Sequence, residues 1–155
     1  MKQLAPVCTL LVVLFVFPPR VGEERPVDAE AIGVLRAVVT AEQGYAARHR
    51  GRFTTPSCLS AAACAGGDAP MLDPAVATLP DRGGYRFTFH PVASAGADSR
   101  ALTGYAITAR PIDEAASHLR AFCADDSGQI VWSRAAVPPT VRDGRCHTTA
   151  RRLLR

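Results

Sequence analysis

Residues 31–51 read AIGVLRAVVTAEQGYAARHRG, and the apolar side chains of this stretch recur at the spacing of an α-helix. They form two neighbouring stripes, which consist of Ile32, Leu35, Val39 and Ala46, and of Val34, Val38, Ala41 and Tyr45. Two such stripes give a helix face that is wide enough to lie on a sheet. We expect Asp28 to cap the N-terminus of this helix and Gly51 to end it.

The chain beyond this helix first loses its periodicity and then changes it. Residues 54–84 contain several prolines and two Gly-Gly pairs but no clear period. We therefore expect a connecting loop on the surface, with a short helix at 73–79. In GGYRFTFHP (83–91) aromatic side chains alternate with polar ones, which predicts a half-buried strand.

Three later stretches also predict strands: GYAITARP (104–111), LRAFCA (119–124) and QIVWS (129–133). The residues between the last two, DDSG (125–128), predict the turn of a hairpin. A helix followed by consecutive antiparallel strands is typical of an α+β layout. The expected fold is an N-terminal amphipathic helix packed on a roughly four-stranded antiparallel sheet.

Residues 1–25 do not share these patterns. Lys2 gives a positive start, and Leu4 to Phe17 is apolar apart from Thr9. A membrane span needs about 20 residues, so this shorter run favours a signal peptide. Because no Ala-x-Ala cleavage site lies near residues 18–26, an uncleaved inner-membrane anchor is the alternative. We expect a periplasmic or secreted protein with one domain at 26–147 and a basic, mobile tail at 148–155.

Four of the five cysteines follow the leader: Cys58, Cys64, Cys123 and Cys146. An even number of cysteines in an exported chain indicates disulfides, because exported compartments are oxidising. Four cysteines allow three pairings. We favour Cys58–Cys64 and Cys123–Cys146, since each pair joins residues that are near in sequence.

The formal net charge of +4 raises the question of a nucleic-acid partner. The basic side chains near the C-terminus are Arg142, Arg145, Arg151, Arg152 and Arg155. Phosphate contacts from such a cluster would make binding strongly dependent on salt. A solvated tail is the simpler interpretation, and the scarcity of lysine is also typical of a GC-rich genome. We expect a membrane partner only if the leader is uncleaved.

The side chains that could carry chemistry do not fall into an established pattern. The cysteine and histidine spacings differ from those of structural zinc sites, and a Cys123–His118 nucleophile would need a free thiolate. The turn at Asp125 is shorter than an EF-hand calcium loop, so we interpret it as a hairpin turn. No Gly-x-Ser-x-Gly, P-loop or dinucleotide-binding motif occurs. We therefore expect no catalytic residue, metal or cofactor.

Several stretches occur in an order that is familiar from one family. AEQGYAARHRGRF (41–53) ends the helix with a glycine and an aromatic residue, and GGYRFTFHP and GYAITARPID (104–113) follow as strands. LRAFCADDSGQIVW (119–132) then gives a Phe-x-x-Asp-x-x-Gly-x-Ile hairpin. In this order they resemble the globular part of type IV pilins and type II secretion pseudopilins, and Cys123–Cys146 resembles that family's C-terminal disulfide loop.

The resemblance does not extend to the N-terminus. A prepilin leader, its glycine cleavage point and the glutamate that follows it are not found before the amphipathic helix. The family's apolar half-helix, which packs the filament core, is replaced by the signal-like leader. The resemblance therefore implies a non-catalytic structural component or adaptor of a pilus or secretion apparatus, with protein partners, rather than a conventional filament subunit. The alternative is a free-standing periplasmic module that binds DNA or a small ligand.

Overall fold

The computed structural model describes residues 26–62, 64, 69–93, 101–113, 118–135 and 137–148. The leader predicted at 1–25 and the tail beyond residue 148 lie outside the described residues. Within the described part of the chain, no helix is long and apolar enough to cross a membrane.

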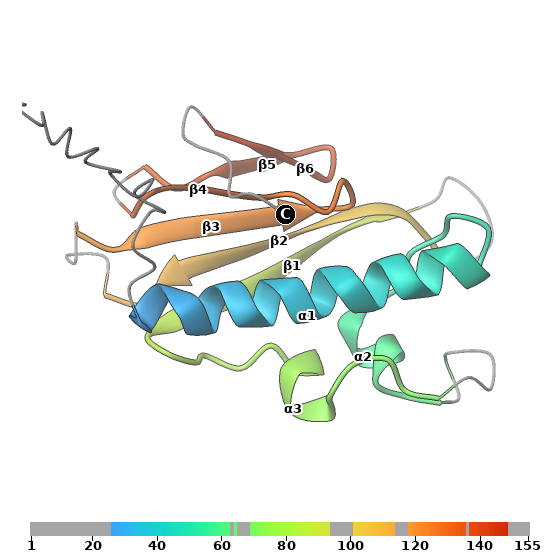
Figure 1. Cartoon of the computed structure of the whole chain (residues 1–155). Coiled ribbons are helices and arrows are strands. Elements are labelled where there is room, and N and C mark those ends of the chain that lie inside the picture. Colours follow the sequence, from blue (N-terminus) through green and yellow to red (C-terminus); the bar gives the residue numbers. More distant parts are fainter. Residues whose placement is uncertain are drawn as a thin grey trace, which may run out of the picture.

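A long helix and a four-stranded antiparallel sheet form the body of the domain (Figure 1). The helix α1 spans Pro26–Arg48, and the strands are β1 (Tyr85–Ala93), β2 (Leu102–Pro111), β3 (Arg120–Asp125) and β4 (Ile130–Arg134). The strands lie in the order β1-β2-β3-β4, so each pairs with its neighbour in sequence. The predicted combination of a helix with four antiparallel strands is confirmed.

Two short helices occupy the connection between α1 and β1, where the sequence predicted mostly loop. They are α2 (Pro56–Leu59) and α3 (Pro74–Ala77), and each begins with a proline directly after a capping side chain. Asp73 caps α3 by accepting a hydrogen bond from the N–H of Ala75 at 2.7 Å. The short helix predicted at 73–79 is therefore present, and α2 is an additional one.

The main core lies between α1 and the sheet. Leu35 and Val38 of α1 are completely buried, in one cluster with Tyr85, Ile107 and Phe122 of the strands. The alternation in β1 arises because its aromatic side chains face this core while the intervening polar ones face away. These aromatic residues therefore form part of the core beneath the helix.

A second hairpin covers the other face of the sheet and was not predicted. It consists of β5 (Thr140–Arg142) and β6 (Arg145–His147), and Val141 and Cys146 pack on Ala106, Cys123 and Val131. Strands of three residues are too short to show a period. The turn between them does carry a hairpin signal, Asp143-Gly144, and both residues have positive φ as a type I′ turn requires.

The N-terminal end of α1 differs from the prediction. The helix begins at Pro26, so Asp28 lies inside its first turn and does not cap it. Its carboxylate is completely buried, accepts a hydrogen bond from the Tyr85 hydroxyl at 2.8 Å, and lies 3.6 Å from Nε of Arg120. The Arg120 guanidinium also lies over the Trp132 ring, 4.5 Å from its centroid. This polar cluster ties the start of α1 to β1, β3 and β4.

The C-terminal end of α1 holds the following loop through a second buried carboxyl. Glu42 is completely buried, and its Oε2 accepts a hydrogen bond from the N–H of Thr54 at 3.1 Å. The neighbouring Phe53 pairs with Leu102 at the start of β2. Burial raises the pKa of Glu42 to about 8, and the Thr54 N–H offsets only part of that effect. At neutral pH most of the Glu42 carboxyl is therefore protonated. As predicted, Gly51 ends the helix, donating to the carbonyl of Ala46 at 2.9 Å.

The Tyr85 hydroxyl should contribute measurably to stability. Tyr85→Phe leaves the buried Asp28 carboxylate without its hydroxyl donor, so we expect the free energy of unfolding to fall by about 1–3 kcal/mol. The matched control is Tyr105→Phe, because the Tyr105 side chain is equally buried and its hydroxyl has no hydrogen-bond partner among the described residues. Urea unfolding of both variants measures the difference. Equal losses would show that the Asp28–Tyr85 bond has no special weight.

Glu42 should make stability depend on pH. Its folded pKa is raised above the unfolded value, so between about pH 4.5 and 8 the unfolded chain releases a proton that the folded chain keeps. The free energy of unfolding should therefore fall as the pH rises through this range, by up to about 1.4 kcal/mol per pH unit. Glu42→Gln should remove that part of the slope, whereas Glu30→Gln, at an exposed position of α1, should not. Urea midpoints at pH 5, 6, 7 and 8 test this, and parallel curves for Glu42→Gln and the unmodified protein would contradict it.

Candidate ligand-binding hollow

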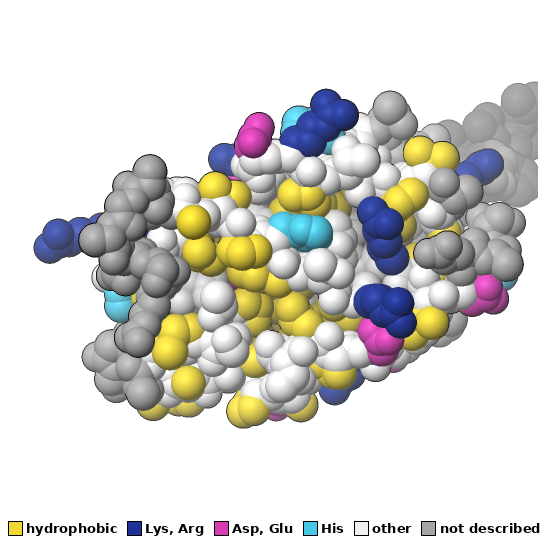
Figure 2. Space-filling view, turned by 180° about the vertical axis from the view of Figure 1, so that it is seen from behind, with side chains coloured by type: hydrophobic (Ala, Val, Ile, Leu, Met, Phe, Trp, Pro, Cys, Tyr) yellow, Lys and Arg dark blue, Asp and Glu magenta, His cyan; other side chains and the backbone are white. Residues whose placement is uncertain are grey.

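The sheet face away from α1 carries a hollow of about 570 Å³ beside the β5–β6 hairpin, which we term the outer hollow. Figure 2 looks onto this side of the molecule and shows a histidine among apolar side chains, with arginines beside them. The residues that line the outer hollow are Arg86, Thr88, His90, Thr108, Arg110, Pro111, Ile112, Pro139, Thr140 and Val141. Its volume lies within the range of small-ligand sites.

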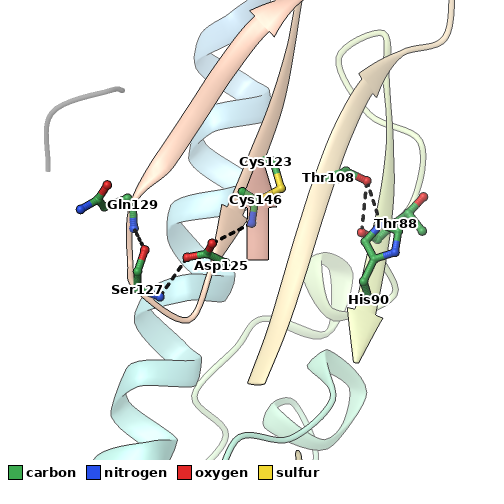
Figure 3. Close-up of a disulfide and its surroundings, with 8 residues drawn as sticks. All are labelled: Thr88, His90, Thr108, Cys123, Asp125, Ser127, Gln129 and Cys146. Carbon is green, nitrogen blue, oxygen red and sulfur yellow. Dashed lines mark hydrogen bonds between the residues drawn. A yellow bond between two sulfur atoms is a disulfide. The ribbon is translucent and has the colours of Figure 1, made fainter. Parts of the chain in front are cut away.

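The floor of the outer hollow is a small hydrogen-bonded group (Figure 3). Nε2 of His90 lies 3.2 Å from the Thr108 hydroxyl, which also reaches the carbonyl of Thr88 at 3.5 Å. Burial, and secondarily the nearby Arg110, lowers the pKa of His90. The imidazole is therefore neutral at physiological pH and serves as a hydrogen-bonding group rather than a cation.

Two arginines stand directly opposite each other at one end of the outer hollow. The antiparallel register pairs Arg86 of β1 with Arg110 of β2. Like charges in this position repel each other across the strands. Arg86 is compensated by Asp81, with Nη2 and Oδ2 separated by 3.1 Å. Arg110 forms no hydrogen bond or ion pair with its side chain to any described residue, and the described lining contains no Asp or Glu.

The contact between Thr108 and His90 invites comparison with a hydroxyl nucleophile and its base. Thr108 is only 5% exposed, so a substrate carbonyl has little access to its hydroxyl. Among the described residues, no carboxylate hydrogen-bonds the other ring nitrogen of His90 to orient it. The geometry therefore favours a binding surface, in which the pair supplies a polar floor.

A disulfide and two polar contacts hold the hairpin that forms one wall of the outer hollow. Cys123 of β3 is joined to Cys146 of β6, as Figure 3 shows. Oδ2 of Asp125 accepts a hydrogen bond from the N–H of Cys146 at 2.9 Å, and Arg145 forms an ion pair with Asp126. These contacts fix β6, and β6 in turn carries β5 with Val141 at the edge of the hollow.

The predicted cysteine pairing is confirmed. Of the three possible arrangements, the structure has Cys58–Cys64 and Cys123–Cys146. The second bond removes the thiol on which a Cys123–His118 nucleophile would depend. Within the described residues, no three His, Cys, Asp or Glu side chains gather as a metal site.

The turn at 125–128 has the geometry of a hairpin turn. Asp125 Oδ1 accepts from the N–H of Ser127 at 3.0 Å, and its other oxygen is bound to Cys146 N–H, so both oxygens hold the backbone. Gly128 takes the positive φ of 76° that closes the turn. Of the arginines proposed for nucleic acid, Arg145 is engaged by Asp126, Arg142 is exposed, and the other three lie outside the described residues.

The outer hollow itself was not predicted from the sequence. The polar side chains of β1 were expected to face solvent, and nothing in the chain indicated that a later hairpin would enclose them. The one available signal was the strand alternation, which places Arg86, Thr88 and His90 on one face. Its partners on β2 and β5 are identified only by the register and by the second core.

Comparison of this chain with protein-family models, with curated proteins and with solved structures finds no significant match. Its function is therefore inferred from the fold and from the chemistry of the outer hollow.

The Cys123–Cys146 bond should hold the outer hollow together. Replacing both cysteines with alanine should cost about 3 kcal/mol of stability and speed amide exchange in β5 and β6. The matched control is the double replacement at Cys58–Cys64, which closes a separate loop near α2 and should leave exchange in β5 and β6 unchanged. Hydrogen exchange with mass spectrometry measures both variants. Unchanged protection of the hairpin after loss of Cys123–Cys146 would contradict this role.

Proposed function

We propose that this chain is an exported, non-catalytic interaction protein with a pilin-like domain, acting as a structural component or adaptor of a type IV pilus or type II secretion apparatus. The observation that carries the proposal is the arrangement of one long N-terminal helix along a four-stranded antiparallel sheet, with a disulfide-linked C-terminal hairpin on the other side. This is the order of elements on which the sequence resemblance rests. Because similarity of fold does not by itself establish function, the proposal also rests on the chemistry of the outer hollow.

The outer hollow supports a binding role. Its walls combine two guanidinium groups, hydroxyls and apolar side chains, which suit recognition of a partner group. Both disulfides support export, because such bonds persist in oxidising compartments. The same features would also suit a free-standing periplasmic module for a small anionic ligand, which is the second candidate.

The proposal predicts where the chain is found and what it contacts in the cell. After fractionation, we expect a mature chain that begins between about residues 20 and 30 and carries no free thiol. Photo-crosslinking residues are placed at Thr88 in the outer hollow, and at Thr40 and Ser127, which line a separate hollow between α1 and the β3–β4 turn. A discrete adduct with an envelope or secretion component from at least one position is expected.

Other outcomes separate the alternatives. A chain retained in the cytoplasm with reduced cysteines would refute export. An exported chain with no adduct from any of the three positions would favour the free-standing module over the adaptor.

A further inference from the structure

The Arg110 guanidinium, which no described side chain pairs, is the first of two features of the outer hollow that point to one kind of partner. Arg110 is exposed, stands directly opposite Arg86, and faces no acidic residue among the described lining. Arg86 is already compensated by Asp81. An anion bound to Arg110 would pair a guanidinium that no described side chain compensates, and it would gain charge-assisted hydrogen bonds.

The second observation is apolar surface beside that charge. Ile112, directly after β2, is 47% exposed, although most other large apolar side chains of the described sheet are buried. Pro111, Pro139 and Val141 continue this apolar wall across the hollow. A small inorganic anion would leave the wall unused. A ligand that carries an apolar group beside its anion would cover it.

We propose that the outer hollow binds an acidic peptide segment of a protein partner, with a Glu or Asp carboxylate on Arg110 and a neighbouring aliphatic side chain against Ile112 and Val141. The inference deepens the proposed function and rests on it, since it assumes that the domain acts by binding another protein. The hydroxyl groups of Thr88 and Thr140 and the neutral His90 supply hydrogen bonds around the carboxylate.

Carboxylate fits this site better than a nucleic acid does. Nucleic-acid affinity comes from several cations that contact successive phosphates. The outer hollow offers two arginines, one of them already paired, and nearly half of its lining is apolar. A single guanidinium beside an aliphatic wall instead matches one acidic side chain next to one apolar side chain.

The test uses the mature chain and the peptide acetyl-Leu-Glu-Val-Glu-Leu-amide at low salt, followed by amide NMR. We expect saturable shifts at the amides of β1, β2 and β5, which disappear with the Gln-for-Glu peptide and weaken at high salt. Arg110→Gln should weaken binding by about tenfold to a hundredfold. The matched control is Arg134→Gln, an exposed arginine of the opposite edge strand, which should bind normally.

A second variant keeps the test decisive if Arg110→Gln misfolds. Thr140→Glu places a carboxylate at an exposed position of β5 in the hollow and should block the peptide without altering the sheet. Equal binding of the Gln peptide, equal weakening by Arg110→Gln and Arg134→Gln, or no saturable shift would overturn the proposal. Tighter binding of inorganic phosphate or duplex DNA at the same amides would overturn it in favour of those ligands.

Different results would refute peptide binding in the outer hollow and the adaptor function. Cellular crosslinks from α1 or the β3–β4 turn, with no peptide binding in the outer hollow, would refute this inference and leave the adaptor function standing. Absence of export and of crosslinks from all three positions would instead refute the proposed function itself.

Discussion

The buried carboxylate of Asp28 is the constraint on which the relation between helix and sheet depends. A charge removed from water is costly unless charged or hydrogen-bonding partners compensate it. Here the partners are the Tyr85 hydroxyl on β1 and the Arg120 guanidinium on β3. Sliding α1 by one turn would separate the carboxylate from both. The apolar core supplies most of the driving force, and this cluster selects one register among several that apolar packing alone would tolerate.

The opposite face of the sheet is organised by covalent rather than apolar means. The β5–β6 hairpin covers only a small second core, in which Val141 and Cys146 lie on Ala106, Cys123 and Val131. Strands of three residues cannot bury enough surface to stay in place alone. The Cys123–Cys146 bond and the Asp125 hydrogen bond supply the missing constraint. Because the hairpin covers only part of this face, the rest of the β1–β2 surface is left as a hollow.

The sequence predicted the elements better than the contacts between them. The long helix, the four strands of the main sheet and the cysteine pairing follow from periodicity and spacing, which are local properties. The prediction that Asp28 caps the helix was wrong. An aspartate near the first turn has the same local sequence pattern whether it caps the helix or points inward to Tyr85. No prediction was made for Glu42, because its burial depends on the loop that brings Thr54 back against the helix. The outer hollow joins β1, β2 and β5, so only the tertiary register identifies it.

The two faces of the sheet differ in what they contribute, and this difference affects how the domain could act. The helix side holds the main core and two buried carboxyls, so substitutions there alter folding before they alter recognition. The hairpin side carries Arg110, which has no ion-pair partner among the described residues, directly opposite Arg86, and like charges in this position weaken a sheet. Local unfavourable charge at a surface hollow is typical of a site that is completed by a partner. The physical case for binding therefore rests on Arg110 and Ile112, whether or not the protein belongs to a pilus or a secretion apparatus.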